Sequence, residues 1–419
     1  MTDLQKYMGE LGAQAKAASA TLRLASEAQR NDALSAMATE IRAREADILS
    51  ANAADMTAAD SKGLSAAMLD RLKLDADRVA GIAKGLDDIA ALPDPVGAVE
   101  KSWTQPNGLI FHKVRVPIGV IAMIYESRPN VTADAGGLCV KSGNACVLRG
   151  GSESARSNAA IHAALQAGLT QAGLPETSIN LVNTTDRAAV GEMLRGLNET
   201  IDIIIPRGGK GLVARVQEDA RVPVLAHLEG LNHSYVHTDA NMKMALQLIE
   251  NAKLRRTGVC GSTETLLVDY LIADSFLPLL KGQIGENCEL RGDTRAQKVL
   301  PGITPATDAD FATEHLAAIL NIAVVDGLDD ALAHIAKYGS GHTDAIITED
   351  AAAAQTFLDS VDSAIVLHNA STQYADGGEF GFGAEIGIAT GRLHARGPVG
   401  AEHLTTYKYQ VRGTGQARP

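Results

Sequence analysis

Residues 201–211 read IDIIIPRGGKG. The apolar run Ile201–Ile205 predicts a buried strand, and the glycines that follow it predict a tight turn into a helix. Strand-like and helix-like segments alternate on both sides of this stretch. Because βαβ units build parallel sheets, the stretch and its surroundings predict an α/β fold.

The chain begins with a region that is expected to be all helical. Apolar residues recur at helical spacing from Leu4 to about Leu92, and Pro93 and Pro95 end the pattern. Residues 109–124 then become rich in β-branched side chains, which predicts strands, one of them from Ile118 to Ile124. The next expected elements are a strand at 145–148, a helix at 154–172 and strands at 179–182 and 201–205.

A second alternating series follows Cys260 and predicts a second α/β domain. Its expected elements are strands at 263–268, 322–325, 345–347 and 363–367, and helices at 271–280, 329–338 and 351–359. The tail from Gly377 is rich in glycine and ends in the strand-like piece Thr405–Tyr409. That piece either pairs with another subunit or belongs to a disordered terminus.

Composition excludes several classes of protein. With 419 residues, 46% hydrophobic and 21% charged, the chain is long and apolar enough to fold into two or three domains. Its net charge of −12 argues against non-specific nucleic-acid binding as the main task. No apolar run reaches the roughly 18–20 residues of a membrane span, and the first residues do not resemble a secretory signal, so a cytoplasmic protein is expected.

The cysteines indicate neither a zinc site nor a disulfide framework, because no CxxC spacing and no paired-histidine motif occurs. Cys260 stands between glycines, just after the cations Lys253, Arg255 and Arg256. Nearby cations favour the thiolate and lower the pKa of a thiol, as a nucleophile requires. Cys139 and Cys146 lie in apolar stretches and are expected in the core, while Cys288 is ambiguous.

Two glycine-containing turns are candidates for binding phosphate groups. In residues 206–211, glycines would let the backbone approach an anion at a helix start, with Arg207 and Lys210 adding charge. The alternative is a plain strand-to-helix turn with solvated cations. The related turn Arg149–Glu153 follows another predicted strand, and its Ser152 is expected to cap the next helix.

A polar cluster follows the strand predicted at Ile118–Ile124. Arg128 and Asn130 stand there, at the strand end where ligands bind in open α/β sheets. The guanidinium of Arg128 suits a carboxylate or a phosphate, and the alternative is a solvated loop.

Several long motifs in order resemble one family over nearly the whole chain. They read YESRPNVTAD (125–134), SGNA and LRGG (within 142–151), IIPRGGKGL (204–212), GVC followed by ETLLV (within 258–268), and GEFGFGAEIGIAT with LHARGPVG (within 378–400). The chain resembles the glutamate-5-semialdehyde dehydrogenases, or γ-glutamyl phosphate reductases, of the aldehyde dehydrogenase superfamily. At residues 257 and 261–262 the family commonly has Pro and Asn-Ala, where this chain has Thr257 and Gly261-Ser262.

The resemblance implies a fold and an activity. The fold is aldehyde-dehydrogenase-like, with two α/β domains of parallel-rich sheets and a small β arm for oligomerisation. The implied domains are 1–256 for the cofactor, with a strand arm near 102–125, then 257–375 for catalysis, and 376–419 as the return segment and oligomerisation arm. The activity is NADPH-dependent reduction of L-glutamyl 5-phosphate, in the second step of proline biosynthesis, through a thioester on Cys260. Implied partners are further copies of the chain and a glutamate kinase.

The resemblance also implies site residues. The backbone N–H of Cys260 and the amide of Asn130 are candidates for stabilising the oxyanion. The implied cofactor residues are Arg149, Gly150, Pro206, Arg207, Gly208, Gly209, Lys210 and Glu314, with Arg149 expected to favour NADPH by gripping its 2′-phosphate. The implied substrate anchors are Ser127, Arg128, His394 and Arg396, the last two of which could instead be interface residues.

One departure bears on the direction of the reaction. Hydrolytic aldehyde dehydrogenases carry a Glu that activates water, and in the matching stretch here His227 takes that place, with Glu229 two residues along. If the stretch is a strand, that shift displaces the carboxylate by about 6–7 Å, although His227 could itself act as a base. The competing interpretations are a dehydrogenase that makes a free acid or an acyl-CoA, and a catalytically silent metabolite-binding protein.

Overall fold

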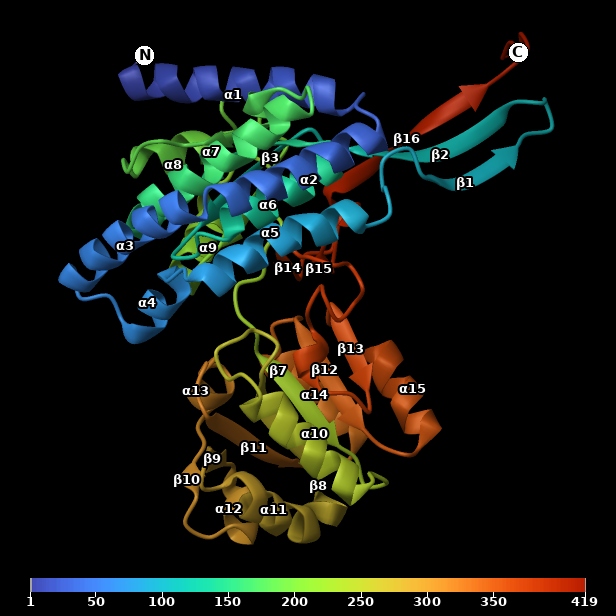
Figure 1. The fold of residues 1–419 in the computed structure, drawn as a ribbon. Helices are drawn as coiled ribbons and strands as arrows, with labels where there is room; N and C mark the ends of the chain where they lie inside the picture. Colours follow the sequence, from blue (N-terminus) through green and yellow to red (C-terminus); the bar gives the residue numbers. More distant parts are fainter. Residues whose placement is uncertain (1, 419) are drawn as a thin grey trace. The chain divides into compact units, whose positions relative to one another are not determined.

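The computed structural model describes residues 2–418, which form two compact units (Figure 1). Unit 1 contains the chain up to Ala226, Gly381–Gly387 and the segment from Val399 onward; unit 2 contains His227–Phe380 and Ile388–Pro398. The units divide earlier than the expected boundary after residue 256. The reason is that β7 (Asn232–Val236) is hydrogen-bonded within the sheet of unit 2 and α10 (Met242–Leu254) packs on it.

The N-terminal region of unit 1 is helical, as the sequence predicts. Its helices are α1 (Asp3–Leu22), α2 (Glu27–Ala43), α3 (Glu45–Ser61), α4 (Ala66–Leu72) and α5 (Ala76–Ala91). On α2, Leu34, Met37 and Ile41 are fully buried, as their helical spacing requires. Among residues 2–418, no helix combines the length and the apolar character needed to cross a membrane.

A four-stranded parallel sheet forms the centre of unit 1, in the order β5-β4-β3-β6. All residues of β3 are buried, which matches a strand covered on both faces. The strands are β3 (Val120–Tyr125), β4 (Ala145–Arg149), β5 (Ile179–Leu181) and β6 (Ile203–Arg207). The helices after them are α6 (Val131–Lys141), α7 (Ala155–Gln171), α8 (Ala188–Leu194) and α9 (Lys210–Asp219).

Gly119 separates β3 from the preceding strand β2 (Ile110–Pro117). Its φ is +138°, and a Cβ there would lie 2.2 Å from a carboxylate oxygen of Asp202. That carboxylate accepts the N–H of Val120 at 2.8 Å. Only glycine suits this corner, so the strand expected to start at Ile118 starts at Val120.

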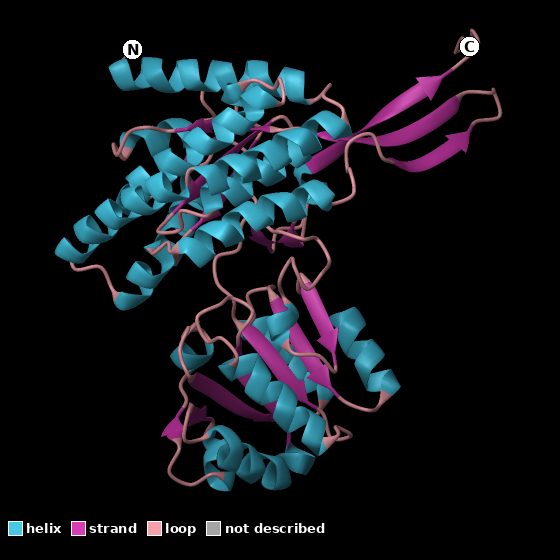
Figure 2. Cartoon of the chain, in the orientation of Figure 1, coloured by secondary structure: helices cyan, strands magenta, loops and turns pink. Residues whose placement is uncertain are grey.

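A three-stranded antiparallel arm extends from the helices of unit 1 (Figure 2). It joins β1 (Val99–Thr104), β2 and β16 (Thr405–Arg412), with β2 in the centre. The C-terminal piece is therefore a strand, and the alternative of a disordered terminus is wrong for it. Its partner within the chain is β2, so pairing of this piece with another subunit stays a prediction.

Unit 2 contains a seven-stranded parallel sheet in the order β10-β9-β11-β8-β7-β12-β13. Alternate residues of β8 enter two cores: Leu266 and Val268 pack in one and Leu267 in the other. The sheet is thus buried on both faces, as a parallel sheet requires. Its strands besides β7 are β8 (Thr263–Asp269), β9 (Glu289–Gly292), β10 (Thr304–Pro305), β11 (Ile319–Val325), β12 (Thr343–Ile347) and β13 (Ile365–His368).

The helices of unit 2 besides α10 are α11 (Tyr270–Ile284), α12 (Thr294–Val299), α13 (Asp308–Phe311), α14 (Leu328–Tyr338) and α15 (Ala351–Ser360). All expected elements of the second series are present, within a few residues at their ends. The return segment adds the short paired strands β14 (Gly387–Ala389) and β15 (Gly397–Val399).

Candidate active site

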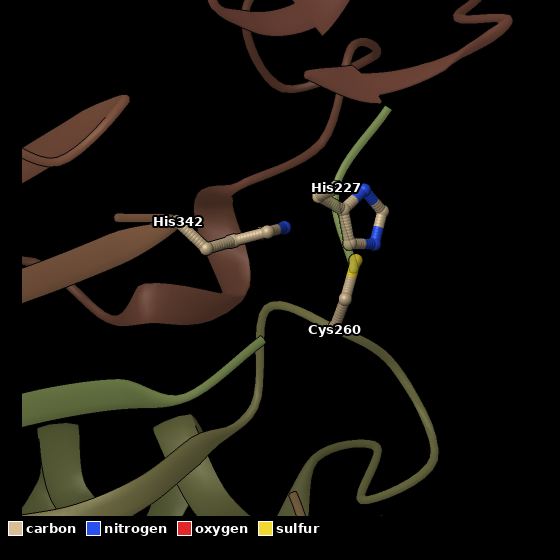
Figure 3. Close-up of side chains that lie close together, drawn as sticks. All are labelled: His227, Cys260 and His342. Atoms are coloured by element: carbon tan, nitrogen blue, oxygen red, sulfur yellow. The ribbon is translucent and has the colours of Figure 1, made fainter. Parts of the chain in front are cut away.

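Cys260, His227 and His342 meet in unit 2 (Figure 3). The sulfur of Cys260 and one ring nitrogen of each histidine all lie within 4.8 Å of one another. Cys260 is partly exposed and lies in the loop between α10 and β8, whereas His342 is fully buried just before β12. A thiol that solvent can reach is thus placed beside two imidazoles.

The orientation of His227 is determined by one hydrogen bond. Its Nδ1 lies 2.8 Å from the carbonyl oxygen of Ile388, which can only accept, so the proton is on Nδ1. In Figure 3 the other ring nitrogen, Nε2, faces the sulfur of Cys260. In the neutral form of the ring, the lone pair is therefore on Nε2, on the side of the thiol. The segment carrying His227 is irregular rather than a strand, so the expected strand geometry for Glu229 is wrong.

The backbone around Cys260 is held by two residues that sequence reasoning missed. Asn232 donates its amide to the carbonyl oxygens of Cys260 at 2.6 Å and Ser262 at 3.0 Å. A Cβ on Gly230 would lie 2.2 Å from the Cys260 carbonyl oxygen. Glu314, the expected ribose residue, accepts the Gly230 N–H at 3.0 Å. In the sequence, the only sign of this role is a glycine and an asparagine, Gly230 just before β7 and Asn232 at its start.

Two of the three cations before Cys260 have partners other than the thiol. Lys253 is buried and pairs with Glu264 at 2.8 Å. Arg255 lies 3.5 Å from the amide oxygen of Gln373. Burial raises the pKa of Glu264 to about 7, and Lys253 opposes that shift. The polar groups beside the sulfur are the two imidazoles instead.

The remaining cysteines are buried in their unit cores. Cys139 and Cys146 occupy α6 and β4 with no exposed surface, which confirms the prediction for both. Cys288 packs in a core of unit 2, and burial raises its pKa to about 11. A thiol in that environment is not a nucleophile at neutral pH.

In unit 1, the carboxyl ends of β3, β4 and β6 bring together the predicted phosphate turns. The N–H of Gly209, at the start of α9, donates to a carboxylate oxygen of Glu126 at 2.9 Å. A Cβ on Gly208 would lie 2.4 Å from the same oxygen. A carboxylate thus already accepts from this helix start, which is the chemistry of an anion site. A phosphate binding there would displace Glu126.

The two cations of the turn at residues 206–211 lie at the end of one element and the start of the next. Arg207 ends β6 and lies 3.6 Å from Glu385, and Lys210 is exposed at the first position of α9. Pro206 is buried inside β6, paired with Ile124. The strand extends two residues further than the apolar run suggests, so the turn itself begins after Arg207, and the expected cofactor role of Pro206 stays a prediction.

Arg149 ends β4 and is half-buried. Its Nη1 donates to the carbonyl of Gly150 at 2.8 Å, while its buried Nε has no hydrogen-bond partner among residues 2–418. Desolvation lowers the pKa of this guanidinium. A Cβ on Gly150 would lie 2.0 Å from the side-chain amide of Asn158. An unpaired buried donor beside an obligatory glycine fits a site for an anionic group of a dinucleotide.

The polar residues after β3 donate hydrogen bonds to nearby carboxylates. The N–H and Oγ of Ser127 donate to Glu153 at 2.7 and 2.8 Å, and Ser127 has a φ of +44°. The amide of Asn130 donates to Asp134 at 2.8 Å, and burial raises the pKa of Asp134 to about 6. Arg128, between Ser127 and Asn130 in sequence, is half-buried.

The structure also gives the positions of Ser152, Arg396 and His394. Ser152 lies in a short 3₁₀ helix, and α7 has Ser154 at its N-cap with no side-chain cap bond, so the expected capping by Ser152 is wrong. Arg396 in unit 2 pairs with Asp362 at 2.6 Å, and His394 is exposed.

Comparison with known proteins gives one consistent result. Residues 5–297 match the aldehyde dehydrogenase family. The chain belongs to this family. It is 62% identical to a protein named gamma-glutamyl phosphate reductase from Hyphomonas neptunium, over 99% of this chain and 97% of the relative. It is likewise 62% identical to one of the same name from Caulobacter vibrioides, over 98% and 100%.

A solved structure agrees with this family assignment. The crystal structure of gamma-glutamyl phosphate reductase from Thermotoga maritima is 42% identical, covers 98% of this chain and 100% of its own, and has a TM-score of 0.96. The aldehyde-dehydrogenase-like fold class is therefore confirmed, and membership of this family supports a nicotinamide cofactor.

Proposed function

We propose that this family member reduces L-glutamyl 5-phosphate to L-glutamate 5-semialdehyde and phosphate with NADPH, the second step of proline biosynthesis from glutamate. Relatives matched over nearly their whole length carry the name gamma-glutamyl phosphate reductase. The observation that carries the proposal is the thiol of Cys260, a partly exposed residue, beside His227. This pairing of a thiol and a base is what acyl transfer from an acyl phosphate needs.

In the first half of the reaction, Cys260 is the nucleophile. Its sulfur attacks the acyl carbonyl while Nε2 of His227 takes the thiol proton, and the bond to phosphate breaks with its electron pair leaving on phosphate. A thioester on Cys260 remains. Because Nδ1 of His227 is hydrogen-bonded to Ile388, the imidazolium formed in this step is stabilised by a carbonyl.

The oxyanion that forms on the acyl oxygen needs donors. The backbone N–H of Cys260 is one candidate, and Asn232 would keep it in place by binding the Cys260 carbonyl. The side-chain amide of Asn130 is the second, oriented by its hydrogen bond to Asp134. The hydride that reduces the acyl group comes from the nicotinamide cofactor when it is bound.

Arg149 with Gly150 would hold the 2′-phosphate side of NADPH, and the turn Arg207–Lys210 would hold the pyrophosphate. Glu314 would bind the nicotinamide ribose and thereby couple cofactor binding to Gly230. Pro206 would act only by shaping the strand that leads into the turn.

The proposed substrate anchors are Ser127, Arg128, His394 and Arg396. Arg128 would pair with the carboxylate or the phosphate of the substrate. Arg396 is already held by Asp362, so a substrate anion would share that guanidinium. Assembly into a homo-oligomer through the β arm and docking of a glutamate kinase remain predictions.

The decisive test is oxidation of NADPH by the purified chain when glutamyl phosphate is generated in situ from glutamate, ATP and a glutamate kinase. We expect stoichiometric release of phosphate and formation of the semialdehyde, and no oxidation when glutamate is omitted. NADPH that stays reduced in the complete mixture, with a folded chain, would contradict the proposal. Activity with an acyl-CoA in place of glutamyl phosphate would favour the acylating alternative.

A further inference from the structure

We infer that Cys260, His227 and His342 form a binding site for a thiophilic divalent cation, of the Zn²⁺ or Cd²⁺ type, that reversibly blocks the proposed nucleophile. The ligand atoms of the three residues lie within 4.8 Å of one another. In tetrahedral zinc sites the Zn–S and Zn–N distances place ligand atoms about 3.4 Å apart. Small side-chain rotations would therefore bring the three ligand atoms to the distances at which they bind one ion.

An independent observation concerns His342. Its Nε2 is fully buried and has no hydrogen-bond partner among residues 2–418. A buried, unsatisfied ring nitrogen costs free energy unless a ligand or an ion uses it. Figure 3 shows a ring nitrogen of His342 directed toward His227 and Cys260. The unpaired ring nitrogen of His342 and the sulfur of Cys260 therefore lie close enough to bind the same ion.

The other ring nitrogens supply the orientation that metal-binding histidines need. Nδ1 of His227 donates to the Ile388 carbonyl at 2.8 Å, and Nδ1 of His342 shares a hydrogen bond of 2.8 Å with the hydroxyl of Thr343. Metal-ligating histidines use their second nitrogen in this way. The rings also pack edge to face at 4.9 Å between centroids, which limits their rotation.

The chemical type of the three ligands determines which ions the site can bind. One thiolate and two imidazoles suit Zn²⁺ and Cd²⁺ and are poor ligands for Mg²⁺ or Ca²⁺. On binding, the sulfur–hydrogen bond of Cys260 breaks, its proton goes to solvent and a sulfur–metal bond forms. Because sulfur's lone pair is then shared with the metal, attack on an acyl carbonyl is blocked until a chelator removes the ion.

The test is titration of the untagged full chain with Cd²⁺, without substrate or cofactor. We expect one ion per chain, with a sulfur-to-cadmium charge-transfer absorption that Cys260→Ser abolishes although Cys288 remains. His227→Gln and His342→Gln should each weaken binding by about 10-fold or more, whereas His315→Gln, a histidine of the same unit outside the cluster, should not.

Two controls keep the result interpretable. Circular dichroism and thermal melting establish that each variant is folded, and since His342 is buried, His227→Gln carries the test if His342→Gln does not fold. Zn²⁺ should also protect Cys260 from iodoacetamide in the wild type, with protection lost on adding EDTA. Undiminished Cd²⁺ affinity in His227→Gln, or no protection by Zn²⁺, would overturn the inference. Neither readout depends on turnover, so the proposed function is tested separately.

Discussion

The Nζ of Lys253 lies 2.8 Å from a carboxylate oxygen of Glu264, and both side chains are almost completely buried. The pair joins the two elements that flank the loop of Cys260, because Lys253 is near the end of α10 and Glu264 is in β8. Burial raises the pKa of Glu264 from its usual 4.5 to about 7. The carboxylate is therefore tolerated largely because Lys253 is there.

Lys253→Met should destabilise the fold by about 3–5 kcal/mol near pH 8, because it leaves a buried carboxylate unpaired. A carboxyl group with a raised folded-state pKa contributes stability at low pH that is lost as pH rises from 4.5 through 7. Without Lys253 the pKa rises further, so the loss in melting temperature should be larger at pH 8 than at pH 5. The exposed Lys281→Met is the control. Equal losses at both pH values would contradict this account.

Gly230→Ala should reduce kcat by roughly 100-fold, because a Cβ there would meet the Cys260 carbonyl oxygen at 2.2 Å and shift the nucleophile. Gly258→Ala, in the loop that carries Cys260, is the control, since a Cβ at 258 meets nothing within 4 Å. Steady-state rates of the two variants decide the point. Similar rates for both would show that the loop adjusts without cost.

Cys260→Ser should abolish turnover while leaving NADPH binding nearly intact, because a hydroxyl has almost the same volume but lacks the nucleophilicity of a thiol. Cys146→Val, in the core of β4, should stay close to wild type. NADPH binding is followed by fluorescence and turnover by absorbance. Substantial steady-state activity of the purified serine variant would exclude the covalent mechanism.

Arg149→Ala should weaken NADPH binding by about 10- to 100-fold and NADH binding much less, since only NADPH offers a phosphate to the guanidinium. The buried, unpaired Nε of Arg149 is the structural reason. Arg215→Ala, on the exposed face of α9, is the control for loss of a charge. Equal losses for the two cofactors would show that Arg149 does not recognise the 2′-phosphate.

Run backwards from glutamate semialdehyde, the enzyme should reduce NADP only when phosphate or arsenate is present as the acyl acceptor. The reason is the expectation that His227 stands in the place of the hydrolytic Glu of other aldehyde dehydrogenases, and in Figure 3 its Nε2 faces the sulfur of Cys260. Absorbance in phosphate-free buffer, with analysis of the product, provides the measurement. Robust NADP reduction there, with free glutamate as product, would favour the hydrolytic alternative.

The sequence by itself determined the repeating elements and the family. Many buried parallel strands are mostly apolar, so runs such as Ile201–Ile205 are visible locally, and β-branched stretches mark the arm. The buried strand β7 reads Asn-His-Ser-Tyr-Val and has no such signal, so it was not predicted. It also singled out Cys260, because a thiol between glycines is an unusual local pattern. Strand ends were less certain, since β6 continues through Pro206 and Arg207 after its apolar run has ended.

Only the tertiary structure decided what surrounds that thiol. Lys253, one of the cations that precede Cys260 in sequence, lies in the last turn of α10 and pairs with Glu264 in the core. His227 and His342 come from distant segments and meet Cys260 because β7, β8 and β12 are neighbours in one parallel sheet, and each of the three residues precedes the amino end of one of these strands. The spacing of cysteines and histidines along the sequence shows no zinc motif, because residues that come together only through neighbouring strands have no characteristic spacing.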